Sequence, residues 1–290
     1  MSKKRKLICV VASAALALSL TLVGCGGGGG STDTNSTSDT SNSATNGTTA
    51  DFTTVTPGVL TVGSDCDYPP FIQMNGAQPE GFEYDLMTAV ADQLGLKLQY
   101  LPPQNFDTLL ASVASGVQLD LGVSSFTITD DRKQLVDFSI PYFDSNQACV
   151  TMTNSSYTSA MDLNGLTVGA QSGTTGADWV RENLTDPGTV LKEFNSTSEV
   201  MAALVAGDLQ GAFYDEPVAA EFVKTNYTNT HIVESIPTGE QYGIAVSKDN
   251  PGLLKALNDA LVTLKQNGTF DQIFLKYFSD LTPPSIKPVS

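Results

Sequence analysis

Two charged side chains of opposite sign lie at positions where a chain can present them to a ligand. Arg132 comes three residues after Thr129, a spacing typical of a helix start with Thr129 as the N-cap. An arginine there can hold a carboxylate with two parallel hydrogen bonds, which a lysine cannot match. Asp215 ends the apolar stretch 212–214, and its carboxylate suits an ammonium group. The pair predicts a clamp for a zwitterion; a surface ion pair and a helix N-cap are the plainer alternatives.

Two adjacent threonines, Thr174 and Thr175, open a predicted helix. Its first turn carries free backbone N–H groups and the positive end of the helix dipole, which together favour an anion. We expect this turn to meet the ligand carboxylate from the side opposite Arg132. Ser125 and Thr127 are expected to line the corresponding turn on the Arg132 side.

The elements that must position these residues alternate between strands and helices. Strands are predicted at 59–63, 97–101, 119–123, 149–152, 167–170, 190–194, 212–214 and 242–246. Helices are predicted at 81–95, 106–114, 175–184, 198–206, 216–224, 253–265 and 270–277. Repeated βα units predict parallel sheets with helices on both faces. The two sets separate near residues 149 and 241, which predicts two α/β lobes with the last helices returning to the first lobe.

The first part of the chain predicts export and anchoring. Residues 1–6 carry four basic side chains, and 7–23 form an apolar run of 17 residues, short for a membrane-spanning helix. Small residues then lead into Cys25, which is typical of a bacterial lipoprotein signal cleaved before a lipidated cysteine. A plain membrane anchor with an incidental cysteine is the alternative. The Gly-, Ser- and Thr-rich segment that follows has little to bury and is expected to be a flexible tether.

Composition excludes several classes of protein. The chain has 15 basic and 31 acidic residues, and the 24-residue leader holds four of the basic ones and no acid. The part of the chain after this leader is strongly acidic. This argues against nucleic-acid binding and against electrostatic binding to an anionic membrane. A hydrophobic fraction of 41% is enough for a core. With one His and no Cys-x-x-Cys pair, we expect no metal site.

Five short motifs occur in a recognisable order. They are Asp65-Cys-Asp-Tyr-Pro-Pro-Phe71, Gly81-Phe-Glu-Tyr-Asp-Leu86, Ser124-Ser-Phe-Thr-Ile-Thr-Asp-Asp-Arg132, Phe138-Ser-Ile-Pro-Tyr142 and Gln171-Ser-Gly-Thr-Thr175. In this order, and with matching segments at 207–216 and 242–246, the chain resembles the family 3 extracellular solute-binding proteins of ABC transporters. The resemblance covers 58–278. It implies a type II periplasmic-binding-protein-like fold: two lobes, each a mixed, mainly parallel sheet flanked by helices, joined by a two-strand hinge.

The expected boundaries follow from these patterns: signal peptide 1–24, lipidated cysteine and linker 25–56, first part of lobe one 57–149, lobe two 150–241, and return to lobe one with the C-terminal tail 242–290.

The resemblance also implies a set of ligand-binding residues. They are Asp65, Tyr68, Phe106, Ser124, Ser125, Thr127, Arg132, Thr174, Thr175 and Asp215. Within this set Arg132 matches the family's carboxylate clamp, Asp215 its ammonium ligand, and Tyr68 and Phe106 its stacking pair around the ligand side chain. Phe106 at a helix start would otherwise be a core residue. Glu83 reads only as a first-turn acid favourable to its helix dipole.

Charge in the cleft predicts the kind of ligand. Asp65, in the position of the family's side-chain-contacting acid, and Asp215 face one Arg132, which leaves an excess of one negative charge around a zwitterion. This favours lysine, arginine or ornithine and disfavours glutamate or aspartate. Glutamine is the runner-up, and Gly176 weighs against a basic ligand because several basic-amino-acid binders carry a longer polar residue there. For Asp67, the simplest alternative is that its side chain points to solvent.

Two cysteines, Cys66 and Cys149, remain after the leader and Cys25 are accounted for. Outside the membrane two thiols often pair, so a disulfide between them is a candidate. Both are expected at first-lobe strand ends near the cleft.

Together these observations predict the binding subunit of an amino-acid importer. It is expected to be a monomer anchored by lipid on the extracytoplasmic face of the cell membrane, with a free amino acid and an ABC permease as partners, no cofactor and no catalysis. One alternative is a secreted dehydratase of the same fold acting on a small carboxylate, which would need a cleft acid or base with a tuned pKa. A sensor ectodomain would need a spanning segment after Pro284, where we expect none.

Overall fold

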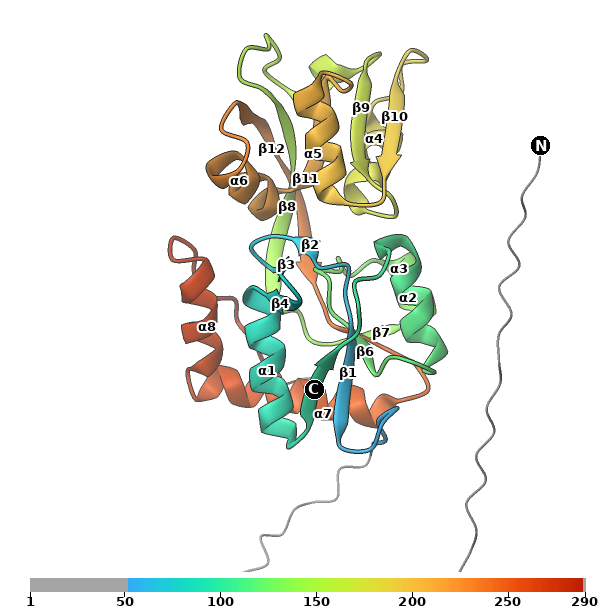
Figure 1. Ribbon diagram of the computed structural model, residues 1–290, viewed down its shortest axis with the longest axis vertical. Coiled ribbons are helices and arrows are strands. Elements are labelled where there is room, and N and C mark those ends of the chain that lie inside the picture. Colours follow the sequence, from blue (N-terminus) through green and yellow to red (C-terminus); the bar gives the residue numbers. More distant parts are fainter. Residues whose placement is uncertain (1–51, 289–290) are drawn as a thin grey trace, which may run out of the picture. The chain divides into compact units, whose positions relative to one another are not determined.

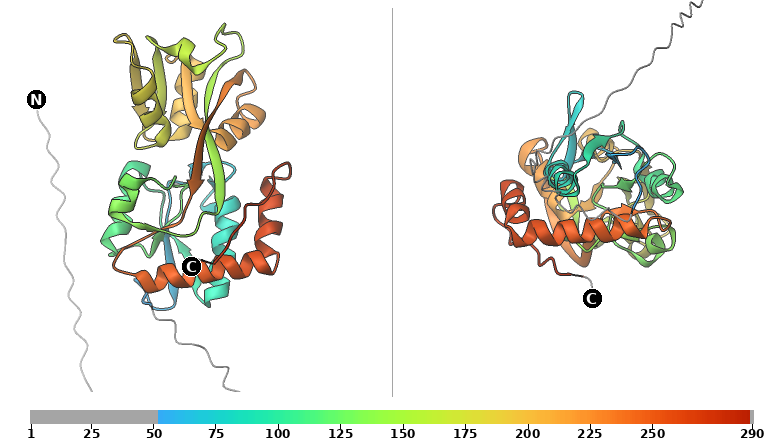
Figure 2. Two further views of the ribbon diagram at one scale, coloured as in Figure 1. Left: turned by 180° about the vertical axis from the view of Figure 1, so that it is seen from behind. Right: turned by 90° about the horizontal axis from the view of Figure 1, so that it is seen from below.

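Two five-stranded sheets form the framework of the protein in the computed structural model, which describes residues 52–288 (Figure 1). The predicted signal peptide, Cys25 and most of the predicted linker lie outside the described residues. Each sheet is covered by its own helices, and the two lobes so formed are joined by two long strands, as the rear view also shows (Figure 2). The expected α/β fold with two lobes is confirmed.

The first lobe combines residues from both ends of the described chain. Its sheet has the order β5 (Lys97–Tyr100), β1 (Val59–Gly63), β6 (Leu121–Gly122), β13 (Ala245–Val246), β7 (Asp137–Phe138). Its helices are α1 (Phe82–Leu94), α2 (Phe106–Ser115), α3 (Asp130–Leu135), α7 (Pro251–Gln266) and α8 (Thr269–Tyr277). A small antiparallel sheet of β2 (Asp67–Tyr68), β3 (Ile72–Asn75) and β4 (Gln78–Glu80) lies beside α1.

The second lobe is built from the middle of the chain. Its sheet has the order β10 (Val190–Phe194), β9 (Thr167–Gln171), β11 (Gly211–Asp215), β8 (Phe143–Met152), β12 (Thr230–Tyr242). Its helices are α4 (Thr175–Asn183), α5 (Thr197–Ala206), α6 (Glu216–Thr225) and the short η1 (Ala160–Leu163). In both lobes the βα units pair in parallel and the strands that change lobe pair antiparallel, so each sheet is mixed.

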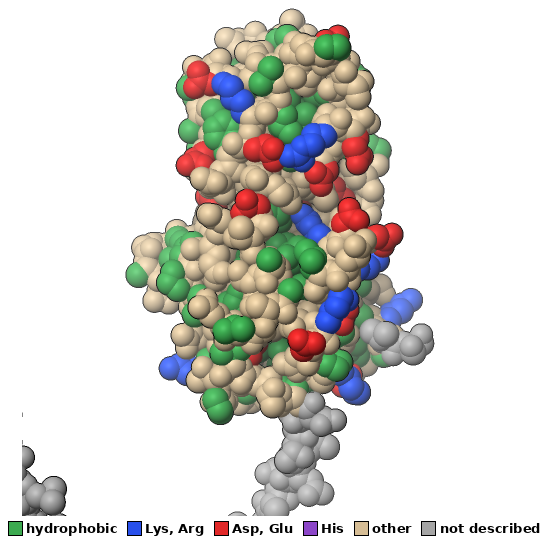
Figure 3. Space-filling model, turned by 90° about the vertical axis from the view of Figure 1, so that its right-hand side faces the viewer, with side chains coloured by type: hydrophobic (Ala, Val, Ile, Leu, Met, Phe, Trp, Pro, Cys, Tyr) green, Lys and Arg blue, Asp and Glu red, His purple; other side chains and the backbone are tan. Residues whose placement is uncertain are grey.

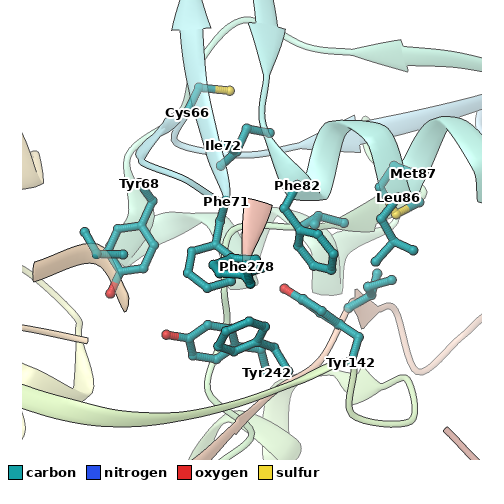
Figure 4. Packing of buried hydrophobic residues seen from close by; sticks show 14 of the residues in the cluster. Cys66, Tyr68, Phe71, Ile72, Phe82, Leu86, Met87, Tyr142, Tyr242 and Phe278 are labelled. Carbon is teal, nitrogen blue, oxygen red and sulfur yellow. The ribbon is translucent and has the colours of Figure 1, made fainter. Parts of the chain in front are cut away.

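Strands β8 and β12 run antiparallel from one lobe into the other. Their pairing extends from Phe143 opposite Tyr242 to Met152 opposite Thr230, with register shifts on the way. At the first-lobe end, Phe143 and Tyr242 stack with ring centroids 5.6 Å apart. Both rings join the buried aromatic cluster around Phe71 and Phe82 (Figure 4). The hinge is thereby fixed in the core of the first lobe.

Local sequence explains where two of the helices begin or end. The hydroxyl of Thr129 accepts a hydrogen bond from the backbone N–H of Arg132, as its spacing predicts for an N-cap. Helix α1 ends at Gly95, whose φ of 68° is the left-handed conformation that glycine adopts most readily. Its buried side chains Leu86 and Val90 lie on one helical face, toward the core.

Two expectations are wrong. Residues 52–56 are not a free tether: the backbone N–H of Val55 donates to Asp120 (2.7 Å), and Asn250 donates to the carbonyl of Thr53 (2.8 Å). The candidate disulfide is absent, since Cys66 and Cys149 are both free and belong to different hydrophobic clusters. Cys149 pairs within the second sheet rather than at a first-lobe strand end. Burial raises the pKa of the Cys66 thiol to about 11, so it is a poor nucleophile.

Candidate functional site

Most of the predicted binding residues, with the exception of Ser125, converge where the two lobes face one another. In each lobe they follow the carboxyl ends of parallel strands, the edge at which open α/β sheets present ligand residues. Asp65 follows β1, Ser124 follows β6, Thr174 follows β9 and Asp215 ends β11. On the face shown in Figure 3, a basic side chain lies at the level where the lobes meet, with acidic side chains around it.

Arg132 is held between the lobes by backbone carbonyls. One guanidinium nitrogen donates to the carbonyl of Thr127 in its own lobe (2.8 Å), and another donates to the carbonyl of Gly173 in the second lobe (2.9 Å). The guanidinium also lies over the ring of Phe106, 5.5 Å from its centroid. Within residues 52–288 it forms no ion pair, so the surface ion-pair alternative is not realised.

Asp215 directs its carboxylate into the cleft rather than onto α6. The side chain makes no capping hydrogen bond to that helix, although Asp215 occupies the N-cap position. It accepts hydrogen bonds from the amide of Gln147 and from the hydroxyl of Tyr242. Burial, and next the charge of Glu240, raise the pKa of Asp215 to about 7. A cationic group beside it would lower that pKa again and fix the negative charge.

Glu240 is a third cleft carboxylate, and sequence analysis missed it. It is 9% exposed and lies on the hinge strand β12. One oxygen accepts from the hydroxyls of Thr127 (2.6 Å) and Thr175 (2.9 Å), one from each lobe. The other accepts from Gln147 (2.9 Å) and Thr238 (3.1 Å). No local motif marks this residue, because three of its four partners come from distant segments of the chain.

Asp65 reaches across the cleft. Ser124 donates to one of its oxygens (2.7 Å), and Gln171 of the second lobe donates to the other (3.1 Å). Burial raises the pKa of Asp65, while these two hydrogen bonds oppose the rise. Tyr68 is buried and lines the same small cavity as Asp215. Figure 4 shows the hydroxyls of Tyr68 and Tyr242 on the same side of the aromatic cluster.

Ser125 is not directed to the cleft. Its φ of 48° is unusual for a residue other than glycine, and both its backbone N–H (2.8 Å) and its hydroxyl (2.9 Å) donate to Glu83. Tyr142 donates to the same oxygen. Glu83 is fully buried, and burial raises its pKa to about 7. Glu83 does lie in the first turn of α1, as expected, but it is buried and supports the Ser125 turn, a role that the sequence did not indicate.

Asp67 is the second cross-lobe acid that the sequence did not identify. Its carboxylate accepts from the backbone N–H of Ser198 (2.9 Å), from the hydroxyl of Ser198 (2.6 Å) and from the hydroxyl of Thr197 (3.0 Å). These donors form the first turn of α5, so a first-lobe carboxylate caps a second-lobe helix. The expectation that Asp67 faces solvent is wrong.

The lobes are closed on one another. The cavity between them, lined among others by Tyr68, Gln147, Gln171, Thr174 and Asp215, has a volume of only about 10 Å³. This is room for about one water molecule. A ligand the size of an amino acid therefore enters by separation of the lobes or by movement of these side chains.

Two buried acceptors in the cleft lack a donor. The amide oxygens of Gln147 and Gln171 are both buried and have no hydrogen-bond partner. A Cβ at position 176 would lie 2.8 Å from the oxygen of Gln147, so Gly176 is what leaves room for that amide. Residues 52–288 contain no cluster of His, Cys, Asp and Glu that could hold a metal ion, nor any helix long and apolar enough to cross a membrane.

Comparison with known proteins gives consistent matches over this same body. A model of "Bacterial extracellular solute-binding proteins, family 3" matches residues 60–280. The chain is 34% identical over 228 residues to a "Probable histidine-binding protein" of Neisseria gonorrhoeae, covering 77% of this chain and 84% of that protein.

Solved structures extend the comparison. The chain is similar to "An ancestral arginine-binding protein bound to arginine", with 38% identity, a TM-score of 0.73, and coverage of 76% of this chain and 98% of that one. It is also similar to the ancestral amino acid-binding protein AncCDT-1, "a precursor of cyclohexadienyl dehydratase", with 33% identity, a TM-score of 0.70, and coverage of 76% and 96%.

Proposed function

The chain belongs to the bacterial extracellular solute-binding proteins, family 3, and we propose that it binds a free L-amino acid with a cationic side chain between its two lobes. Arg132 and the first turn of α4 bind the ligand carboxylate, and Asp215 binds the ligand ammonium. Asp65 binds the cationic end of the side chain. No covalent bond is made or broken, and the ligand acts by favouring the closed arrangement that a partner ABC permease recognises.

The excess of buried acceptors is the observation that carries this proposal. Asp65, Asp215 and Glu240 are all at most 9% exposed, and Arg132 is the cation that lies near Asp215 and Glu240. When all are ionised, three negative charges and one positive leave a net −2. The unpaired amide oxygens of Gln147 and Gln171 add acceptors without donors. A ligand rich in N–H donors satisfies such a cleft, whereas glutamate would add a further negative charge to it.

The names of two of the relatives agree with this chemistry. Histidine and arginine, which two of the compared proteins are described as binding, both carry basic side chains. Gly176 does not oppose a basic ligand, because Gln147 fills the space that a longer side chain there would need. Glutamine, with an amide that can donate to Asp65, remains second to a cationic ligand in the order of expected affinities.

Calorimetry with the purified protein tests the proposal. We expect arginine, lysine, ornithine or histidine to bind more tightly than glutamine, and glutamate to bind weakly. In Asp65→Asn, the cationic ligand should lose about 2 kcal/mol or more and glutamine much less, because only the cation leaves a charge poorly paired. Asp92→Asn, on the exposed face of α1, is the matched control. Tight glutamate binding, or equal losses for both ligands, would refute the assignment of Asp65.

We also propose that the chain is a lipoprotein held at the extracytoplasmic face of the cell membrane through Cys25. The support is the apolar run ending at Cys25 and the extracellular character of the family. Replacing Cys25 by Ser should release the protein from the membrane fraction or leave the leader uncleaved. Fractionation and mass measurement check this; a Cys25→Ser chain that is both mature in size and membrane-bound contradicts it.

A dehydratase is the second candidate, and one observation favours it. Asp215 is a cleft carboxyl with a pKa of about 7, which could transfer a proton, and AncCDT-1 is described as a precursor of such an enzyme. The same pKa is accounted for by burial next to Glu240 without any catalytic role. Incubation with arogenate or prephenate separates the candidates, and we expect no turnover.

A further inference from the structure

We infer that Glu240 is an internal occupant of the ligand-carboxylate subsite, and that it holds the lobes closed when no ligand is bound. This inference rests on the proposed function in one respect: the hydroxyls of Thr127 and Thr175 were assigned to the ligand. In the structure both hydroxyls donate to a single oxygen of Glu240, at 2.6 and 2.9 Å. The side chain thus takes two of the donors that a ligand carboxylate would use.

The bonds of Glu240 join both lobes through one carboxylate. Thr127 belongs to the turn that also receives Arg132, while Thr175 begins α4 in the second lobe. Gln147, on hinge strand β8, supplies a third donor. A carboxylate that accepts from both lobes and from the hinge favours closure for the same reason that a bound ligand does.

The backbone around Glu240 is suited to moving its side chain. The pairing of β12 with β8 shifts register between Ile236 and Glu240, and Gly239 has a φ of 66°. Pairing on the two sides of this irregularity is not continuous, so the strand can change locally without unpairing from end to end. Glu240 is therefore attached to an irregular part of the hinge, where the strand can change locally when the lobes separate.

Competition follows from charge. A ligand carboxylate bound to Thr127 and Thr175 would meet the carboxylate of Glu240 at close range in a buried site, which is unfavourable. The ligand must therefore displace Glu240 from these hydroxyls. If Glu240 keeps about nine-tenths of the ligand-free molecules closed, it weakens apparent affinity about tenfold.

Small-angle X-ray scattering of the ligand-free protein tests the closing role. We expect Glu240→Ala to have a larger radius of gyration than the unmodified protein. Asp144→Asn, which removes an exposed acid from the partner hinge strand, should leave the radius unchanged. If Glu240→Ala is as compact as the unmodified protein, the inference is wrong. Glu240→Gln removes the charge alone, keeps an acceptor and serves if the alanine variant does not fold; we expect it to change the radius in the same direction but less.

Titration with L-arginine tests the competing role. We expect Glu240→Ala to bind L-arginine about tenfold more tightly than the unmodified protein. Unchanged or weaker binding would show instead that Glu240 assists the ligand, and would overturn the inference. If neither protein binds any amino acid, the proposed function fails, and the scattering comparison still judges the closing role of Glu240.

Discussion

At the scale of single residues, Asp215 is a cleft side chain whose charge depends on pH near neutrality. Its pKa of about 7 means that a large fraction is protonated at pH 6, whereas binding an ammonium group requires the ionised form. Binding should therefore release a proton from Asp215, and affinity for L-arginine should rise from pH 5.5 to pH 8 by up to about tenfold per pH unit.

Calorimetry in two buffers of different ionisation enthalpy measures both the affinity and the protons released. In Asp215→Asn the pH dependence should largely vanish, and affinity should fall by about 2–5 kcal/mol because the ligand ammonium is left unpaired. A flat pH profile in the unmodified protein would show that Asp215 does not bind the ammonium group.

Residue types and spacing predicted part of this site. The residues that could not be predicted share a physical reason. Arg132, Asp65 and Asp215 sit beside strand ends and a helix start, which are local features that a sequence displays. Glu83 and Glu240 could not be recognised in this way. Their burial depends on donors 42 and 113 residues away, which only the folded chain brings to them.

At the scale of elements, the cap that Asp67 places on α5 links the two lobes directly. The helix has its own N-cap in Ser196, which accepts from the backbone N–H of Glu199, and Asp67 satisfies the N–H of Ser198 from the other lobe. Removing it with Asp67→Ala should cost the closed arrangement about 1 kcal/mol and weaken L-arginine binding about fivefold, mainly through faster dissociation.

Stopped-flow dissociation measures this effect, and Ser196→Ala is its control. Both changes remove one cap from the same helix, but only Asp67 acts across the cleft. The Ser196 variant should therefore lower the melting temperature and leave the dissociation rate nearly unchanged. Equal dissociation rates for Asp67→Ala and the unmodified protein would mean that the cap does not contribute to closure.

Elements with one clear periodicity were predicted well, whereas the two-strand hinge was expected from the family resemblance but the bounds of its strands were not. Strands β1 and β10 occur at the predicted residues, since short runs bounded by turn residues identify them. Strand β12, Thr230–Tyr242, was missed although it is the longest strand described. It contains Pro237 and Gly239 and is buried only in part, because it crosses from one lobe to the other. A strand that passes from one lobe into the other does not keep one regular alternation of apolar and polar residues along its length.

At the scale of the whole molecule, two buried carboxyls, Asp215 in the cleft and Glu83 beneath the Ser125 turn, make stability depend on pH. Both Asp215 and Glu83 have pKa values of about 7, above their ordinary values near 4, so the folded state binds more protons than the unfolded state between those limits. The free energy of unfolding therefore falls as pH rises from about 4 to about 7, by at most about 1.4 kcal/mol per pH unit for each group. The protein is therefore less stable at neutral pH than at mildly acidic pH, because these two buried acids ionise as the pH rises.

Glu83→Gln separates the structural carboxyl from the ligand-binding one. Glutamine keeps an acceptor for Ser125 and Tyr142, but it places an amide N–H₂ where the second oxygen of Glu83 has no partner. The variant should be less stable than the unmodified protein at pH 5, and the difference should shrink toward pH 8, where the unmodified protein carries the buried charge. Urea unfolding followed by circular dichroism at pH 5, 6, 7 and 8 measures it, with the exposed Glu182→Gln as control. A difference that stays constant over this range would mean that Glu83 does not titrate there, and the pH dependence would then have to come from the cleft carboxyls alone.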